Sequence, residues 1–413
     1  MPKATVRRSR PGPELMLKGR SSKKWSGLAR EARPLLLPAL IGLAGAAAAS
    51  AYTVARLAEK ARPDFALQLY PSLAPAKTHK ADALLADTAA GRGRFMRARS
   101  LAFESLAADP LNPAALRVIA ATEPASSPRL APLLDLASKA SRREVGVQLL
   151  QIELAVTRNR VDQALHHYDQ ALKVKPSVGS ILFPVLLNAA TDRELLPSIR
   201  CVIAANPVWL RNLSSWVLEN PELMPQFALL VPALPLRSEA ASQDFGHAIV
   251  EGLVEQRRYP EAYSSYLTYK RAMLLTPKEE HRPYRPFEWM PVESPDFGAE
   301  ANDENNAFEL YASQNATGDV LRRLTRNAPG RYRLSFAVEP LEGRPQSFQT
   351  SITCPASSGS APRLPSKVSA VGNIVRVEYA VPPNCPFQWI QMTLKAGTSP
   401  VRMRLSRFGH QTI

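Results

Sequence analysis

The stretch VDQALHHYDQALKVKP at residues 161–176 decides the fold of the larger part of this 413-residue chain. Within it, Ala164, Tyr168, Ala171 and Pro176 follow one another at spacings of 4, 3 and 5 residues. Spacings of three and four place side chains on one face of an α-helix, and a proline ends the helix that precedes it. The stretch therefore predicts a helix whose small residues let a second helix pack closely.

The same frame recurs along the chain at intervals that indicate a repeat. It is found at Ala98, Ala102, Ser105 and Pro110, again less regularly at Leu195, Ile199, Val202 and Pro207, and as a weaker echo at Ala262 and Tyr266. The three closing prolines are separated by 66 and 31 residues, close to two periods and one period of about 34 residues. The pattern resembles the second helix of the tetratricopeptide repeat. The resemblance implies an all-α tetratricopeptide-like superhelix over residues 56–280 that binds a protein on its concave face.

His166 and Tyr168 are the candidate partner-binding residues of this region. Adjacent histidines such as His166 and His167 point about 100° apart on a helix. They therefore lack the i, i+4 spacing of a helical zinc site, and no metal site is expected. Cys201 lies in an apolar helical run and is expected to be a buried small residue.

An uncharged run, LLLPALIGLAGAAAASAYTV at 35–54, follows a basic N-terminus. Its length of about 20 residues is what a helix needs to cross the hydrocarbon core of a bilayer. About ten of residues 1–33 are lysine or arginine, and such residues concentrate on the cytoplasmic side. The sequence predicts a basic cytoplasmic tail at 1–33, a transmembrane helix at 34–55 in a bacterial inner membrane, and a periplasmic remainder. The alanine-rich end of the run leaves a cleaved signal peptide open as the alternative.

From residue 281 onward the hydrophobic period changes from about 3.6 to two. The segments GRYRLSFAV at 330–338, NIVRVEYAV at 373–381 and VRMRLSRF at 401–408 alternate apolar and polar residues, as half-buried strands do. Further strands are expected near Phe308, Phe348 and Trp389. About seven or eight strands in all predict a β-sandwich of jelly-roll size over residues 281–413.

Cys354 and Cys385 both fall within this β-domain, whereas Cys201 does not. In an oxidising periplasm the pair can form a disulfide. The closed loop of about 30 residues would then stabilise the domain by about 3 kcal/mol. Two separate free thiols are the alternative.

The segment APGRYRLSF at 328–336, the early aromatic pair Phe287 and Trp289, and the closing VRMRLSRF resemble those of jelly-roll carbohydrate-binding modules. Such modules bind sugars with exposed aromatic rings, so the resemblance implies Trp289, Tyr332 and Trp389 as carbohydrate-binding candidates. Packing in the core is the alternative for each ring. The acidic loop at 296–304 is expected to be solvated, and a calcium site is its alternative.

The order of these parts resembles that of accessory proteins in bacterial exopolysaccharide assembly. The resemblance implies a non-catalytic, membrane-anchored scaffold without a cofactor, whose partners are an envelope protein complex, a polysaccharide and the inner membrane. The net charge of +16 does not predict nucleic-acid binding, because roughly half of the excess lies in the N-terminal tail. The alternative function is a polysaccharide hydrolase or lyase. It would need paired carboxylates, and no spacing in the sequence selects such a pair.

Overall fold

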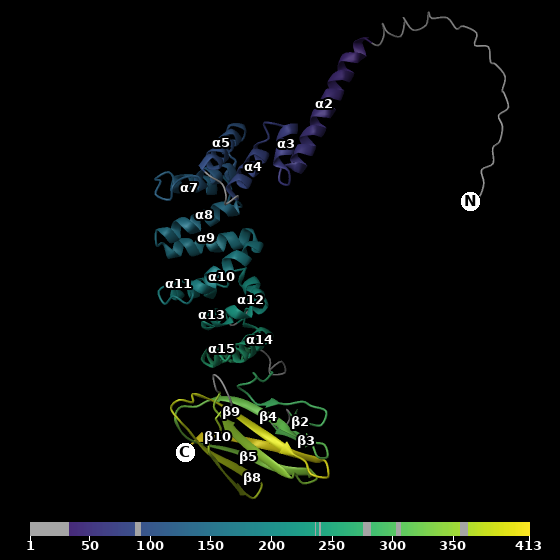
Figure 1. The fold of residues 1–413 in the computed structure, drawn as a ribbon, viewed down its shortest axis with the longest axis vertical. Helices are drawn as coiled ribbons and strands as arrows, with labels where there is room; N and C mark the ends of the chain where they lie inside the picture. Colours follow the sequence, from purple (N-terminus) through teal and green to yellow (C-terminus); the bar gives the residue numbers. More distant parts are fainter. Residues whose placement is uncertain are drawn as a thin grey trace, which may run out of the picture. The chain divides into compact units, whose positions relative to one another are not determined.

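The computed structural model describes residues 33–86, 92–235, 237–238, 241–275, 282–302, 307–355 and 362–413. The chain divides into two compact units, Met1–Val147 and Gln148–Ile413. The helical N-terminal part and the C-terminal antiparallel β-sandwich confirm the coarse fold prediction (Figure 1). Apart from Arg33, the predicted basic tail lies outside the described residues.

The first unit is helical. Its elements are α2 (Arg33–Ala58), α3 (Pro63–Leu69), α4 (Ala74–Ala86), α5 (Arg92–Ala108), α6 (Pro113–Ala121), α7 (Leu130–Ala140) and the first residues of α8 (Val145–Thr157). The segment Leu40–Ala58 of α2 is long and apolar enough to cross a membrane, and very little of it is buried within the protein. The structure thus provides one possible transmembrane helix where the sequence predicts it.

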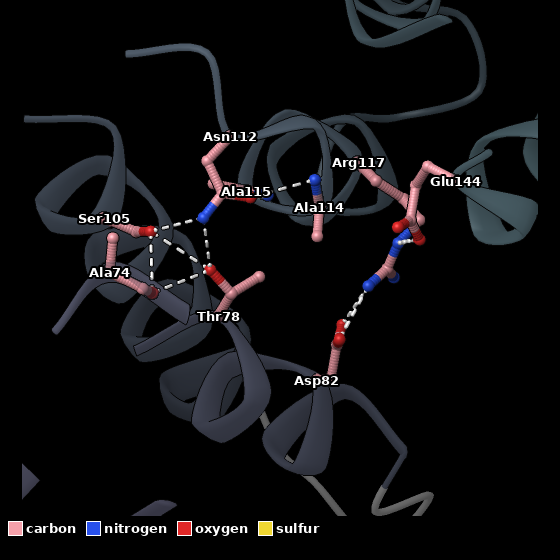
Figure 2. A network of polar contacts seen from close by, with 9 residues as sticks. All are labelled: Ala74, Thr78, Asp82, Ser105, Asn112, Ala114, Ala115, Arg117 and Glu144. Atoms are coloured by element: carbon pink, nitrogen blue, oxygen red, sulfur yellow. Dashed lines mark hydrogen bonds and ion pairs between the residues drawn. The ribbon is translucent and has the colours of Figure 1, made fainter. Parts of the chain in front are cut away.

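A buried polar network joins α4, α5 and α6 (Figure 2). The Thr78 and Ser105 hydroxyls both donate to the carbonyl of Ala74, at 3.0 and 2.9 Å. The Asn112 amide donates to both hydroxyls, and its Oδ1 accepts from the backbone N–H of Ala114 and Ala115 at the start of α6. Asn112 therefore caps α6 and ties three helices together, which leaves none of these buried polar side chains unpaired.

Arg117 provides a second tie within the first unit (Figure 2). Its guanidinium binds the Asp82 carboxylate of α4 at 2.6 Å and the Glu144 carboxylate at 3.1 Å. The half-buried arginine thus bridges α4 to the segment immediately before α8.

The second unit continues the helical part. It contains the rest of α8, then α9 (Val161–Val174), η1 (Pro176–Val178), α10 (Gly179–Ala189), α11 (Leu196–Ala204), α12 (Leu210–Glu219), η2 (Pro221–Leu223), α13 (Met224–Ala228), η3 (Val231–Ala233), α14 (Gln243–Glu255) and α15 (Tyr259–Met273). In α9 the frame residues Ala164, Tyr168 and Ala171 are buried, and the helix ends just before Pro176. The spacing thus predicts both the buried face and the end of this helix correctly.

The β-sandwich follows. Its strands are β1 (Met290–Pro291), β2 (Phe297–Asn302), β3 (Ala307–Ala312), β4 (Thr317–Arg326), β5 (Gly330–Glu342), β6 (Ser347–Thr353), β7 (Ser366–Val371), β8 (Ile374–Val381), β9 (Phe387–Lys395) and β10 (Val401–Thr412). A four-stranded sheet, which we call sheet A, has the order β1-β4-β9-β6, and a six-stranded sheet B has the order β2-β3-β10-β5-β8-β7. All pairs are antiparallel. Ten described strands exceed the seven or eight expected, because β1 is too short and β7 too exposed to show an alternating pattern.

Apolar side chains from both sheets meet in one core, among them Phe336 and Leu405 of sheet B and Ile390 and Met392 of sheet A. Cys354, just after β6, and Cys385, just before β9, form a disulfide at the edge of this core. The predicted disulfide is confirmed.

Within the second unit, α15 packs against the outer face of sheet A at one end. The ring of Phe387 on β9 lies 5.8 Å from that of Tyr259 and 6.1 Å from that of Tyr263, centroid to centroid. The Arg326 guanidinium of β4 lies 5.2 Å from the Tyr263 ring. Aromatic packing therefore covers the beginning of β9 and the end of β4.

Candidate functional site

The outer face of sheet A carries a row of polar side chains around one tryptophan. Along β9, Ile390, Met392 and Leu394 are buried in the core, so the intervening Trp389, Gln391 and Thr393 point to the opposite face. The register of β4 and β6 then places further side chains beside them on that face. These are Thr317, Asp319 and Arg322 from β4, and Ser347, Gln349, Ser351 and Thr353 from β6. We call this set, with Trp389, Gln391 and Thr393, the sheet A face.

Asp319 organises the middle of the sheet A face. Its carboxylate accepts a hydrogen bond from the Thr393 hydroxyl at 2.6 Å and another from the Gln391 amide at 3.3 Å. These contacts fix the orientation of the Gln391 side chain. A half-buried carboxylate and a held amide present acceptors and a donor in a defined geometry, as recognition of hydroxyl groups requires.

Trp389 is half-buried and lies toward the α15 end of the sheet A face. The exposed guanidinium of Arg322 lies 5.8 Å from the centre of its indole, within cation–π range. Arg322 has no carboxylate partner among the described residues; its Nη2 donates to Met290 Sδ at 3.9 Å, a weak hydrogen bond, and its other N–H groups can reach a ligand. An aromatic ring beside such donors can combine stacking with hydrogen bonding.

The sheet A face is bounded on one side and open on the other. The packing of Phe387 against α15 closes it next to Trp389. From Trp389 to Lys395 the strand runs about 20 Å at about 3.3 Å per residue. That length can accommodate an extended ligand rather than a single small molecule.

The structure does not bring the three aromatic candidates together. The half-buried Trp289 packs against the sandwich core, with its ring 5.1 Å from that of Phe408. The Arg323 guanidinium lies 5.9 Å from the Trp289 ring. Trp289 also lines a cleft of about 600 Å³ together with Arg285 and Phe308. It therefore belongs to a different surface from Trp389.

The half-buried Tyr332 on β5 takes part in an aromatic group packed against the sandwich core. Its ring lies 5.9 Å from that of Tyr379 and 5.6 Å from that of His410, and its hydroxyl donates to the carbonyl of Ala328. Tyr379 and His410 are hydrogen-bonded at 2.7 Å. Burial lowers the pKa of His410, and the positive charge of Arg323 adds to this effect. The imidazole is therefore neutral at pH 7, as a packed side chain should be.

Of the two partner-binding candidates, the structure exposes His166 and buries Tyr168. His166 lines a groove of about 770 Å³ between α9 and α11, together with Leu165, Cys201 and Val208. Tyr168 is only 8% exposed and faces the interior of the helical layer.

Cys201 lines this groove, and His167 follows His166 on α9. Cys201 is exposed, so the expectation of a buried cysteine is wrong. The buried residues of α11 are instead Ile199 and Ile203, on the other side of the helix. His167 shares a hydrogen bond of 2.9 Å with the Gln148 side chain, and burial lowers the pKa of His167, with a smaller contribution from His166.

Sequence reasoning found Trp389 but missed Asp319, Arg322, Gln391 and Thr393. The alternation of FQWIQMTLK at 387–395 could have identified Gln391 and Thr393 as companions of Trp389. It could not have identified Asp319, because that residue comes from another strand. Within the described ranges no group of three or more histidine, cysteine or acidic side chains could hold a metal ion. Asp303 and Glu304 of the acidic loop lie outside those ranges.

No protein-family model matches this chain, and no curated protein sequence matches it. Among solved structures it is similar to the enzymatically active domain of bacteriophage CBA120 tailspike protein 4, at 13% identity and a TM-score of 0.23, over 31% of this chain and 20% of that one. It is also similar to the carbohydrate-binding module TmCBM61 in complex with β-1,4-galactotriose, at 8% identity and a TM-score of 0.21, over 30% of this chain and 88% of that one. The chain thus spans about a fifth of the tailspike domain. Similarities this weak carry no conclusion about function.

Proposed function

We propose that this chain is a non-catalytic, membrane-anchored glycan-binding protein of the bacterial cell envelope, and that its glycan lies on the sheet A face. The observation that carries the proposal is the grouping of Trp389 with Arg322, Gln391 and Asp319 on one sheet surface. A sugar ring has an apolar face that stacks on an indole and a rim of hydroxyls that pair with amides, carboxylates and guanidinium groups. The sheet A face supplies both kinds of contact.

The anchor is α2, with the N-terminus in the cytoplasm and the bulk of the chain in the periplasm. Two features support export. The segment Leu40–Ala58 is apolar enough to span a bilayer, and a disulfide such as Cys354–Cys385 forms in oxidising compartments. The basic residues before the span favour the proposed orientation.

The helical part serves as the protein-binding region, in the manner of a tetratricopeptide-like superhelix. The groove between α9 and α11 is mostly apolar, and exposed His166 and Val208 line it. A partner of the envelope complex that assembles or exports polysaccharide would bind there, while the sandwich holds the polysaccharide itself.

A hydrolase or lyase remains the competing function. Glycoside hydrolysis needs two carboxyl groups about 5 to 10 Å apart. Among the described residues of the sheet A face, Asp319 is the one carboxylate, and it is engaged by Thr393 and Gln391. This arrangement suits a positioning role better than proton transfer.

The test uses the full chain in detergent, immobilised and exposed to a panel of bacterial exopolysaccharides. We expect retention of at least one polysaccharide, with unchanged chain length after prolonged incubation. The Trp289→Phe variant should retain it equally, because Trp289 lies on another surface. Shortening of a polysaccharide by the wild type, abolished in Asp319→Asn, would establish the competing function instead.

A further inference from the structure

The short helix α3 lies beside the C-terminal end of α2 (Figure 1). A small apolar cluster joins the two helices, with Ala55 of α2 packed among Ala66, Leu73 and Ala76. Farther up α2, the Tyr52 ring makes an edge-on contact with the ring of Tyr70, at 5.3 Å between centroids. These contacts hold α3 alongside the segment 52–58.

That segment belongs to the candidate membrane span, which fixes the depth of α3. The uncharged run of the span ends before Arg56, so the edge of the hydrocarbon core falls within the segment 52–58, which is about 9 Å long along the helix axis. The headgroup region on each side of a hydrocarbon core is about 5 to 8 Å thick. A helix packed against the last turns of the span therefore lies at the level of the headgroups.

One exposed face of α3 is apolar. Phe65 and Leu69 are four residues apart on one face of the helix and are 44% and 36% exposed, and the adjoining Tyr70 is 40% exposed. In water these side chains would remain hydrated. At a membrane interface, by contrast, aromatic and apolar side chains insert among headgroups and upper acyl chains.

The charges around α3 suit the same environment. Lys60 and Arg62 are exposed and have no ion-pair partner among the described residues, so they are free to bind lipid phosphates. Arg56 pairs with Glu59 at 2.9 Å. The acidic residue of α3, Asp64, is neutralised by Lys80 at 2.5 Å. The surface thus combines an apolar face with unpaired positive charge.

We propose that α3 is an interfacial helix: Phe65, Leu69 and Tyr70 insert into the leaflet from which α2 emerges, and Lys60 and Arg62 bind its phosphate groups. The inference rests on the proposed membrane anchor. It adds that the anchor and α3 form one membrane-bound element, so the first helices of the chain are held at a fixed tilt to the bilayer. An anchor followed by a free linker would impose no such tilt.

The experiment uses the full chain in liposomes of phosphatidylethanolamine and phosphatidylglycerol. In a Cys201→Ser background, which keeps the native disulfide, single cysteines replace Leu43, Phe65, Leu69 or Phe103 and carry a nitroxide label. Collision with oxygen and with a water-soluble nickel chelate then reports the depth of each label. Leu43 lies within the span, and Phe103 is a matched exposed aromatic residue on α5.

We expect the label at 43 in the hydrocarbon core, those at 65 and 69 at headgroup depth, and that at 103 in water. A label at 43 in the core with labels at 65 and 69 as accessible to nickel as that at 103 would overturn the inference and leave the anchor intact. A label at 43 in water would overturn both.

Discussion

The two outer faces of the sandwich differ in how their charged groups are used. On sheet B, Arg333 pairs with Glu378 at 2.7 Å, and Arg404 pairs with Glu309 at 2.8 Å and with Glu339 at 3.3 Å. On the sheet A face, Arg322 lies over Trp389, and no acidic residue that the structure describes pairs with it. These ion pairs engage the charges at the middle of sheet B, whereas sheet A leaves donors and an aromatic ring available. The difference supports our proposal that the glycan lies on sheet A rather than on sheet B.

Removing the disulfide should have the largest effect, and it should act mainly on sheet A. Cys354 follows β6 and Cys385 precedes β9, so the bond ties together two strands of that sheet. We expect Cys354→Ser with Cys385→Ser to lower the free energy of unfolding of the sandwich by about 3 kcal/mol. Calorimetry of the double variant measures this, with Cys201→Ser as the control. An unchanged melting temperature would show that the bond does not stabilise the sheet.

The next effect concerns binding rather than stability. Trp389→Ala should weaken retention of a bound polysaccharide by about tenfold, equivalent to about 1.4 kcal/mol, because the stacking surface is lost. The matched change on sheet B, Arg333→Gln with Glu378→Gln, should leave affinity unchanged. Titration calorimetry with the same polysaccharide compares the two. Equal losses in both variants would remove the distinction between the faces.

Removing the charge that orients the Gln391 amide should reduce polysaccharide affinity less than Trp389→Ala does. Asp319→Asn keeps the shape of the side chain but removes the charge that accepts from Thr393 and Gln391. We expect affinity to fall about threefold, or by about 0.6 kcal/mol, which is within the usual contribution of one hydrogen bond. Gln349→Ala, on the same face but across β9 from Asp319, should change affinity less. A larger loss in Gln349→Ala would move the binding centre toward β6.

The smallest expected effect is a loss of thermal stability at low pH that is caused by the arginine–glutamate pairs of sheet B. The hydrogen bonds from Arg333 and Arg404 lower the pKa values of Glu378 and Glu309, respectively. A glutamate has a pKa of about 4.3 in the unfolded chain. A carboxyl group whose pKa is lower in the folded protein stabilises the fold at pH values above about 4.3, and this stabilisation is lost as the pH falls through the lower, folded-state pKa. We expect a small drop in melting temperature between about pH 5 and pH 3 that is reduced in Glu378→Gln with Glu309→Gln. An identical drop in the variant would assign the acid sensitivity to other groups.

The sequence predicts the parts of this molecule in which one pattern governs a whole element. The face of α9 and the alternation of β5, β8 and β10 follow directly from side-chain periodicity. Side-chain periodicity does not predict β4. A register shift between Asp319 and Leu321 interrupts the alternation there, and Leu324 is buried although it lies on the outward side of the sheet. Periodicity also fails for Cys201, because α11 is apolar on several sides and the sequence does not say which side faces inward.

The candidate site was only partly predictable for a related reason. Aromatic residues such as Trp289, Tyr332 and Trp389 look alike in sequence, and their strand partners decide which of them is available to a ligand. The pairing of β4 with β9 brings the Arg322 guanidinium over the Trp389 ring, although the two residues are 67 positions apart in the sequence. Such long-range pairing follows from the sheet topology, which local patterns do not encode.

The central claim, that a glycan binds on the sheet A face, is tested most directly by labelling all five tryptophans with 5-fluorotryptophan and recording ¹⁹F spectra during titration with a retained polysaccharide. Single Trp→Phe variants assign the signals. We predict that the Trp389 signal shifts with the binding curve while those of Trp289, Trp209 and Trp216 stay in place. Saturable binding that moves the Trp289 signal and leaves the Trp389 signal unchanged would contradict the claim.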